Sequence, residues 1–243
     1  MASVIVVSIP IELENRQEIS NALLNKYSTD YLFIGRTLWS TTTSKSCEIN
    51  ISSIFPDNRD LAKAIKIAGQ NKVDFHTLEV ISQSRQTVQL VSLDVGYQAC
   101  QTIAHFTQVF LNIGGIAVNI ESGSIAHEAE RWLAKYNSQD VFDIYSLYVG
   151  LIEGEDIYYS CGMQNFGKAD VSLDITEDIG LAIYVMNVFN YYRLTESPIL
   201  QDGHTFQPDI ESPSYQIKLV EDREYEPDSL QHNLLGRWHL QRY

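Results

Sequence analysis

Two glycine-centred clusters restrict the folds open to this chain more than any other feature of its sequence. Residues 161–167 read CGMQNFG and residues 198–205 read PILQDGHT, each beside a hydrophobic segment. Glycine adopts positive backbone φ angles that residues with a Cβ reach only at a cost, so both clusters predict sharp bends. An aspartate before glycine also closes Asx turns, which we expect at Asp202 through the backbone near His204 or Thr205. The predicted structural motif consists of Gly162, Phe166, Gly167, Asp202, Gly203 and Thr205, with the Phe166 ring as a plug in the core.

The pattern of short apolar runs around these clusters is typical of an α+β fold. Alternating or β-branched runs predict strands at 4–9, 31–39, 47–54, 87–94, 116–120, 171–175 and 215–220. Helical periodicity predicts helices at 15–27, 57–68, 97–111, from Ser122 or Ser124 to 136, and at 177–192. Because hairpins interrupt the alternation of strands and helices, we expect mixed or antiparallel sheets packed against helices.

Several local details refine this prediction. Residues 144–152 and 157–163 flank a Glu-Gly-Glu-Asp turn and predict a long hairpin that carries tyrosines. The helix at 177–192 has almost no polar face, which predicts a central, buried position. Asp57 is expected to cap the helix that it begins, and Gly69 to end that helix in the left-handed conformation. We expect one compact domain over residues 1–243, with possible pseudo-halves at 1–112 and 113–243.

The length and charge of the chain narrow the classes of partner. A chain of 243 residues buries enough surface to fold without disulfides or a structural metal. Its 31 acidic and 17 basic residues give a formal charge of −14, which repels nucleic acid and anionic membranes. The same charge attracts a basic protein over long range. We therefore expect a basic protein partner, no nucleic acid and no membrane, and leave the oligomeric state open.

The cysteines and the N-terminal residues point to a cytoplasmic protein. Cys47, Cys100 and Cys161 are odd in number and lack CxxC spacing, so neither a disulfide framework nor a zinc site is predicted. The apolar run at 4–9 has no basic segment before it and predicts a strand rather than a signal peptide. No apolar run approaches the roughly 20 residues that span a bilayer.

The order of the motifs resembles one known family. A Gly114-Gly115 strand is followed by a helix ending in ERWL at 130–133, then by the 162–167 cluster and the Asp-Gly-x-Thr turn at 202–205. This order is similar to that of the domain of unknown function 4261 family, although residues 168–170 depart from the usual pattern. The resemblance covers nearly the whole chain. It implies a bacterial, cytosolic α+β protein with some relatives encoded near secretion-system toxins, and it supplies no accepted catalytic residue.

Catalytic patterns are weak throughout the sequence. Cys161, His204 and Asp202 have the residue types of a thiol nucleophile, its base and an orienting carboxylate, which keeps a hydrolase-like enzyme open as an alternative. His127-Glu128 begins a zinc-binding helix pattern, but Arg131 stands where the second histidine is needed. No glycine-rich nucleotide loop is present. We expect no catalytic residue, no metal and no cofactor.

An acidic C-terminal stretch interleaved with tyrosines is the predicted recognition surface. Aromatic rings supply contact area at protein interfaces, and charges speed the encounter. The predicted partner-binding residues are Asp209, Glu211, Tyr215, Glu221, Asp222, Glu224, Tyr225 and Glu226. The leading hypothesis is a non-enzymatic cytosolic binding protein, such as an immunity protein that neutralises a co-encoded bacterial toxin by direct binding. A structural assembly subunit is the third possibility.

Overall fold

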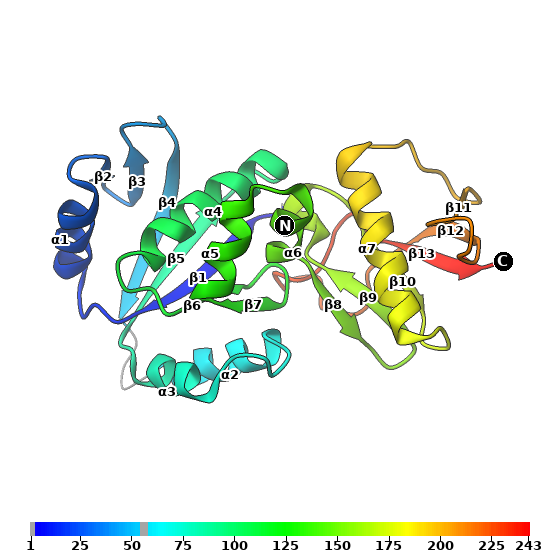
Figure 1. The fold of residues 1–243 in the computed structure, drawn as a ribbon, viewed down its shortest axis with the longest axis horizontal. Coiled ribbons are helices and arrows are strands. Elements are labelled where there is room, and N and C mark those ends of the chain that lie inside the picture. Colours follow the sequence, from blue (N-terminus) through cyan, green and yellow to red (C-terminus); the bar gives the residue numbers. More distant parts are fainter. Residues whose placement is uncertain (1–2, 54–57) are drawn as a thin grey trace.

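Two β-sheets that follow one another along the chain organise the fold (Figure 1). A computed structural model describes residues 3–53 and 58–243. The first sheet has seven strands in the order β2-β3-β4-β5-β1-β6-β7, and all of its pairings are antiparallel. Its strands are β1 (Ile5–Ile11), β2 (Tyr31–Ile34), β3 (Thr37–Ser40), β4 (Ser46–Ser53), β5 (Gln86–Ser92), β6 (Ala117–Ile120) and β7 (Ile125–Glu128).

The second sheet is mixed. It has six strands in the order β11-β12-β13-β10-β9-β8, and β13 pairs in parallel with β10. Its strands are β8 (Gly150–Glu153), β9 (Ile157–Cys161), β10 (Asp170–Asp174), β11 (Thr205–Phe206), β12 (Tyr215–Val220) and β13 (Arg237–Arg242). A 3-10 helix η1 (Met163–Phe166) connects β9 to β10. The α+β class with mixed and antiparallel sheets is therefore confirmed.

Helices cover both faces of the first sheet and one face of the second (Figure 1). Buried side chains of α4 pack on β1, β4 and β5, and α2 packs on the opposite face at β6 and β7. In the second sheet, α7 packs its buried stripe of Ala182, Val185, Met186 and Phe189 against β9 and β10. The helices are α1 (Arg16–Tyr27), α2 (Arg59–Ala68), α3 (Phe75–Gln83), α4 (Tyr97–Leu111), α5 (Ala129–Ser138), α6 (Val141–Tyr148) and α7 (Ile179–Thr195).

The prediction that Gly69 ends helix α2 in the left-handed conformation is wrong. Gly69 has a φ of −77°, and the chain turns instead at Gln70 and Asn71, which both have positive φ. Glycine is needed at this position for another reason, because a Cβ on Gly69 would lie 2.6 Å from Cγ2 of Val73. The predicted cap, Asp57, lies outside the described residues, and Asn58 occupies the position before α2. Helix α3 was not predicted, although Asp74 caps it by accepting from two backbone amides.

The segment 122–148 differs most from the sequence prediction. Residues 125–128 form β7 in a hairpin with β6, so the helix begins at Ala129 and not at Ser122 or Ser124. The predicted long hairpin is shorter, because residues 141–148 form α6, capped by the Asp140 side chain. Ile144, Tyr145, Leu147 and Tyr148 are buried on that helix. A short run of apolar residues is compatible with a helix or a strand, and here the Asp140 cap favours the helix.

The prediction of a central helix needs correction. The apolar helix α7 lies on the outside of the second sheet, with Ile179, Ile183 and Tyr184 more than two fifths exposed. The change from one sheet to the other falls between Glu128 and Gly150, whereas the predicted pseudo-halves divide at 112/113. The division into halves stays a prediction.

Candidate functional site

A groove of about 1370 Å³ opens where the two sheets meet, and we call it the central groove. Its walls come from α2, the β6–β7 turn, α5, α6, β8, α7 and residues 225–231. Four of its apolar side chains are substantially exposed, namely Ile67 (76%), Ile179 (49%), Ile183 (43%) and Phe142 (40%). Soluble proteins seldom leave several large apolar side chains together in a concave surface unless something binds there.

The charges of the central groove are unevenly distributed. Lys72, Arg131 and Lys135 lie along the walls contributed by the α2–α3 connection and α5, and Lys135 pairs with Asp143 at 3.4 Å. The end of β8 adds the exposed Glu153, and the turn after it carries Glu155 and Asp156, which are exposed but do not line the groove. None of these three forms an ion pair within residues 3–53 and 58–243. The groove therefore combines three basic side chains with an unpaired carboxylate at the end of β8.

The first glycine cluster fixes the junction of the two sheets. Gly162 has a φ of 121°, and a Cβ placed on it would lie 2.2 Å from the carbonyl oxygen of Tyr148. Asn165, which is completely buried, accepts a 2.7 Å hydrogen bond from the Ser122 hydroxyl. The Gln164 amide donates to the carbonyl oxygens of Ser122 and Leu230. These contacts hold η1, the β6–β7 turn and the C-terminal segment together beneath the groove.

The Phe166 prediction and the positive φ predictions are confirmed. Phe166 is 5% exposed and packs against the rings of Tyr97 and Tyr148. Gly167 and Gly203 have φ angles of 68° and 86°. The buried position of Phe166 and the bends at these glycines can therefore be predicted from local sequence.

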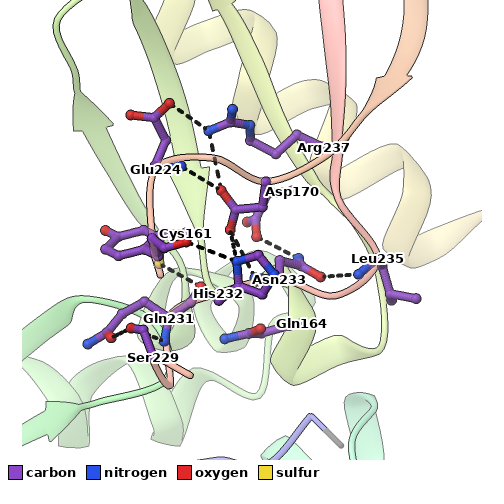
Figure 2. Close-up of polar contacts among 12 residues, drawn as sticks. Cys161, Gln164, Asp170, Glu224, Ser229, Gln231, His232, Asn233, Leu235 and Arg237 are labelled. Atoms are coloured by element: carbon purple, nitrogen blue, oxygen red, sulfur yellow. Dashed lines mark hydrogen bonds and ion pairs between the residues drawn. The ribbon is translucent and has the colours of Figure 1, made fainter. Parts of the chain in front are cut away.

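A polar network ties residues 221–236, which we call the C-terminal strap, to the second sheet (Figure 2). The buried carboxylate of Asp170 accepts hydrogen bonds from Ser160 Oγ (2.9 Å), the backbone amide of Met163 (3.2 Å) and Asn233 Nδ2 (2.6 Å). The backbone amide of Asn233 in turn donates to the Asp222 carboxylate at 2.9 Å. The strap is therefore anchored from within the protein and not by surface charges.

Arg237 extends this network toward the groove. Its guanidinium lies 3.5 Å from Asp222 and 3.3 Å from Glu224, and it stacks over the Tyr159 ring at 5.6 Å. Tyr225 packs edge-on against Tyr159 and lines the groove. Arg237 is therefore connected to the groove through Tyr159, whose ring contacts the groove-lining Tyr225.

Two of the predicted partner-binding residues are buried and need correction. Tyr215 is 0% exposed in the core of the second sheet, and the Asp222 side chain is 5% exposed inside the strap network. Asp209 is exposed but accepts from Tyr184 and caps its own loop. Tyr225 lines the groove, whereas Glu211, Glu221, Glu224 and Glu226 are exposed outside it. The acidic stretch is thus partly scaffold and partly surface.

The geometry separates the residues of the hydrolase-like alternative. Cys161 is 1% exposed on β9, and burial raises the pKa of its thiol. His204 precedes β11, four strands away in the sheet order, which at about 4.8 Å per strand is roughly 19 Å. Asp202 accepts from the Leu219 amide at 2.8 Å, so it bridges to β12 and does not close the predicted Asx turn. The three side chains do not meet.

Sequence reasoning missed the polar residues that position this site. Asp170 begins β10 and was read only as a departure from a family pattern, and Asn233 lies 63 residues later. Gln164 and Asn165 lie inside the first glycine cluster, for which the sequence predicts only backbone bends and a buried ring. A buried carboxylate at a strand start carries no local signature, because its donors come from distant segments.

Two buried titratable groups give stability a testable pH dependence. Burial raises the pKa of Asp170 to about 6, although hydrogen bonds from Asn233, Ser160 and Met163 oppose the shift. Burial lowers the pKa of His127 to about 4. A raised folded-state pKa contributes stability that is lost as pH rises through it, and a depressed one contributes stability that is lost as pH falls through it. Between pH 6.5 and 4 the two contributions, about 3 kcal/mol each, therefore oppose one another.

A variant that lacks one of the two groups should reveal the pH dependence of stability that the other group causes. The free energy of unfolding of His127→Gln, relative to the unchanged protein, is expected to rise as pH falls from 6.5 to 4. The corresponding difference for Asp170→Asn should fall over the same interval. Urea unfolding at half-unit pH steps measures both differences, and parallel pH curves for all three proteins would contradict the assignment.

Among the described residues, no group of three or more His, Cys, Asp or Glu side chains has the arrangement of a metal site. None of the helices in that part of the chain is long and apolar enough to cross a membrane. No family model matches the chain, and no curated protein or solved structure matches it.

Proposed function

We propose that this protein is a non-enzymatic, cytosolic binding protein that holds a basic partner protein in the central groove. An immunity protein that neutralises a co-encoded bacterial toxin by direct binding fits this description. The observation that carries the proposal is the coexistence of four exposed apolar side chains and the unpaired Glu153 carboxylate in one groove. Protein interfaces combine an apolar centre with a charged rim in this way.

Charge supports a basic partner in particular. The formal charge of −14 attracts a cationic protein at long range and raises the rate of encounter. The carboxylates of Glu153, Glu155 and Asp156 then provide local partners for lysine or arginine side chains. The resemblance to the domain of unknown function 4261 family motivates the choice of a toxin as that partner.

Co-expression with the product of the adjacent gene tests the proposal. The complex is expected to co-purify, and expression of this protein should restore growth to cells that produce the neighbouring protein. Ile183→Arg places a cation in the groove, and we expect it to weaken binding about 30-fold, or roughly 2 kcal/mol. Its exposed position makes the substitution compatible with folding.

Ile210→Arg provides the matched control. Ile210 is 94% exposed and does not line the groove, so the same substitution there should change affinity less than about threefold. Isothermal titration calorimetry at one salt concentration compares the affinities of the two variants for the neighbouring protein. Absence of binding and of growth protection, or equal affinities of both variants, would overturn the proposed function.

A further inference from the structure

Strand β8 is an edge of the second sheet and has a single neighbouring strand, β9. An edge strand presents unpaired backbone N–H and C=O groups, which makes it a template for another extended chain. Leu151, Ile152 and Glu153 of β8 line the central groove. We infer that the groove receives its partner as an added β-strand along β8, a mode of recognition that rests on the proposed function.

The register of the hairpin shows which backbone groups are open. The amide of Gly154 donates to the carbonyl oxygen of Ile157 at the turn, so Ile152 and Gly150 exchange hydrogen bonds with β9 while Leu151 and Glu153 face outward. The Gln70 side chain supports this register, since its Nε2 donates to the Leu151 carbonyl oxygen at 2.9 Å from the outer side. A side-chain amide thus occupies one position that a docking strand would use.

The other sheet edges are less suited to this role. Strand β11 has only two residues. At β7, α2 packs against the strand, and the Glu128 side chain accepts from the Asp74 amide at 2.6 Å. Strand β2 lies at the far end of the first sheet and does not line the groove. Strands β7 and β8 both have four residues, but β8 gives Leu151, Ile152 and Glu153 to the groove, whereas β7 gives Ile125 alone.

The surroundings of β8 define the chemistry of the added strand. Leu151 and Tyr158 pack beside the α7 core, and the exposed Ile179 and Ile183 of that helix line the same groove. One face of an added strand would therefore be apolar. Because side chains alternate along a strand, Glu153 shares the α7 face with Leu151, and Glu155 and Asp156 lie beyond the strand in the turn. The occupant is therefore an extended segment that is apolar where it passes α7 and carries lysine or arginine at the end beside the β8–β9 turn.

A synthetic peptide tests this inference without the natural partner. The probe is a fluorescein-labelled decapeptide of seven alternating valine and threonine residues followed by three lysines, and binding is measured by anisotropy. Two controls contain the same residues: one has the three lysines in the middle of the peptide, and the other is N-methylated at alternate residues, which removes amide donors. We expect the alternating peptide to bind at least tenfold more tightly than either control.

Proline substitution in β8 separates strand addition from charge attraction. Leu151→Pro removes an outward amide and leaves the bonds to β9 intact, as proline is tolerated on edge strands. It should weaken binding of the alternating peptide at least tenfold, whereas Leu151→Ala, which keeps the amide, should change it less than threefold. Gln70→Ala frees the Leu151 carbonyl and should tighten binding two- to fivefold.

The outcomes for the two proposals are distinguishable. Equal binding of the alternating peptide, the control with central lysines and the N-methylated control would overturn strand addition, even if Leu151→Pro failed to fold. If the neighbouring protein binds and Ile183→Arg weakens it, but Leu151→Pro does not, the proposed function stands and strand addition is wrong. If the alternating peptide passes its controls while the neighbouring protein does not bind, the β8 site is supported and the proposed identity of the partner is wrong.

Discussion

Replacing Gly162 by alanine is expected to lower the free energy of unfolding by about 4 kcal/mol or more. The added methyl group would lie 2.2 Å from the Tyr148 carbonyl oxygen and 3.1 Å from the Cα of Gly123. Both obstacles are backbone atoms, which cannot rotate away as a side chain does. Relief requires the β9–η1 connection to separate from the end of α6, so the junction of the two sheets opens. Because natural domains are stable by only about 5–15 kcal/mol, the variant should be largely unfolded at moderate temperature.

Gly96→Ala is the matched control for this substitution. Gly96 has a φ of 120°, almost equal to that of Gly162, but a Cβ there meets nothing within 4 Å. Alanine at Gly96 therefore incurs only the backbone strain of a glycine-only conformation, about 1–3 kcal/mol. Urea unfolding followed by circular dichroism gives both values. Equal losses for the two variants would show that strain, and not the clash with Tyr148, explains the requirement for glycine.

Asp170→Ala is expected to reduce stability by about 3–5 kcal/mol at pH 8. The substitution leaves the Ser160 hydroxyl, the Met163 amide and the Asn233 side-chain amide without their acceptor in a fully buried place. Since Asn233 anchors the strap, the loss should also increase hydrogen exchange of the amides in residues 221–236. Urea unfolding and hydrogen exchange measured by mass spectrometry test the two parts separately.

Asp174→Ala on the same strand serves as the comparison. The Asp174 side chain is 53% exposed and lies 3.6 Å from His239, so its removal should cost no more than about 1 kcal/mol. Hydrogen exchange of the strap should be unchanged in this variant. A small effect of Asp170→Ala, similar to that of Asp174→Ala, would mean that the strap is held by its other contacts.

Local sequence patterns predicted the elements whose cause is local. The helix expected at 97–111 and the strand expected at 215–220 have the same bounds in the structure, because apolar periodicity and flanking turns define them. The positive φ of Gly162 was also predicted. Its cause was not, since the obstacle is a carbonyl oxygen of α6 that approaches only after both sheets have folded. The helix at 141–148 was missed because Asp140 was not recognised as its cap.

The candidate site could be predicted only in part. The acidic charge and Tyr225, which is half-buried, were found from the sequence, but the groove depends on distances between segments that lie far apart in the chain. The exposed residues of α7 were read as buried, because an apolar helix surface looks the same whether it faces a core or a binding groove. Tyr215 and Asp222 were read as surface residues for the opposite reason, since an acidic neighbourhood does not reveal a buried ring or a buried ion pair.

The position of β13 has a consequence for how the molecule assembles during translation. Within the described residues, strand β13 lies between β12 and β10, although it follows both in the chain, and it links the β11–β12 pair to the remainder of its sheet. The hairpin of β11 and β12 can contact α7 through Phe206 beforehand, but its backbone cannot be joined to β10 until residues 237–242 have emerged from the ribosome. A nascent chain halted before residue 237 would therefore hold the second sheet in two separate pieces, which join only when β13 is added.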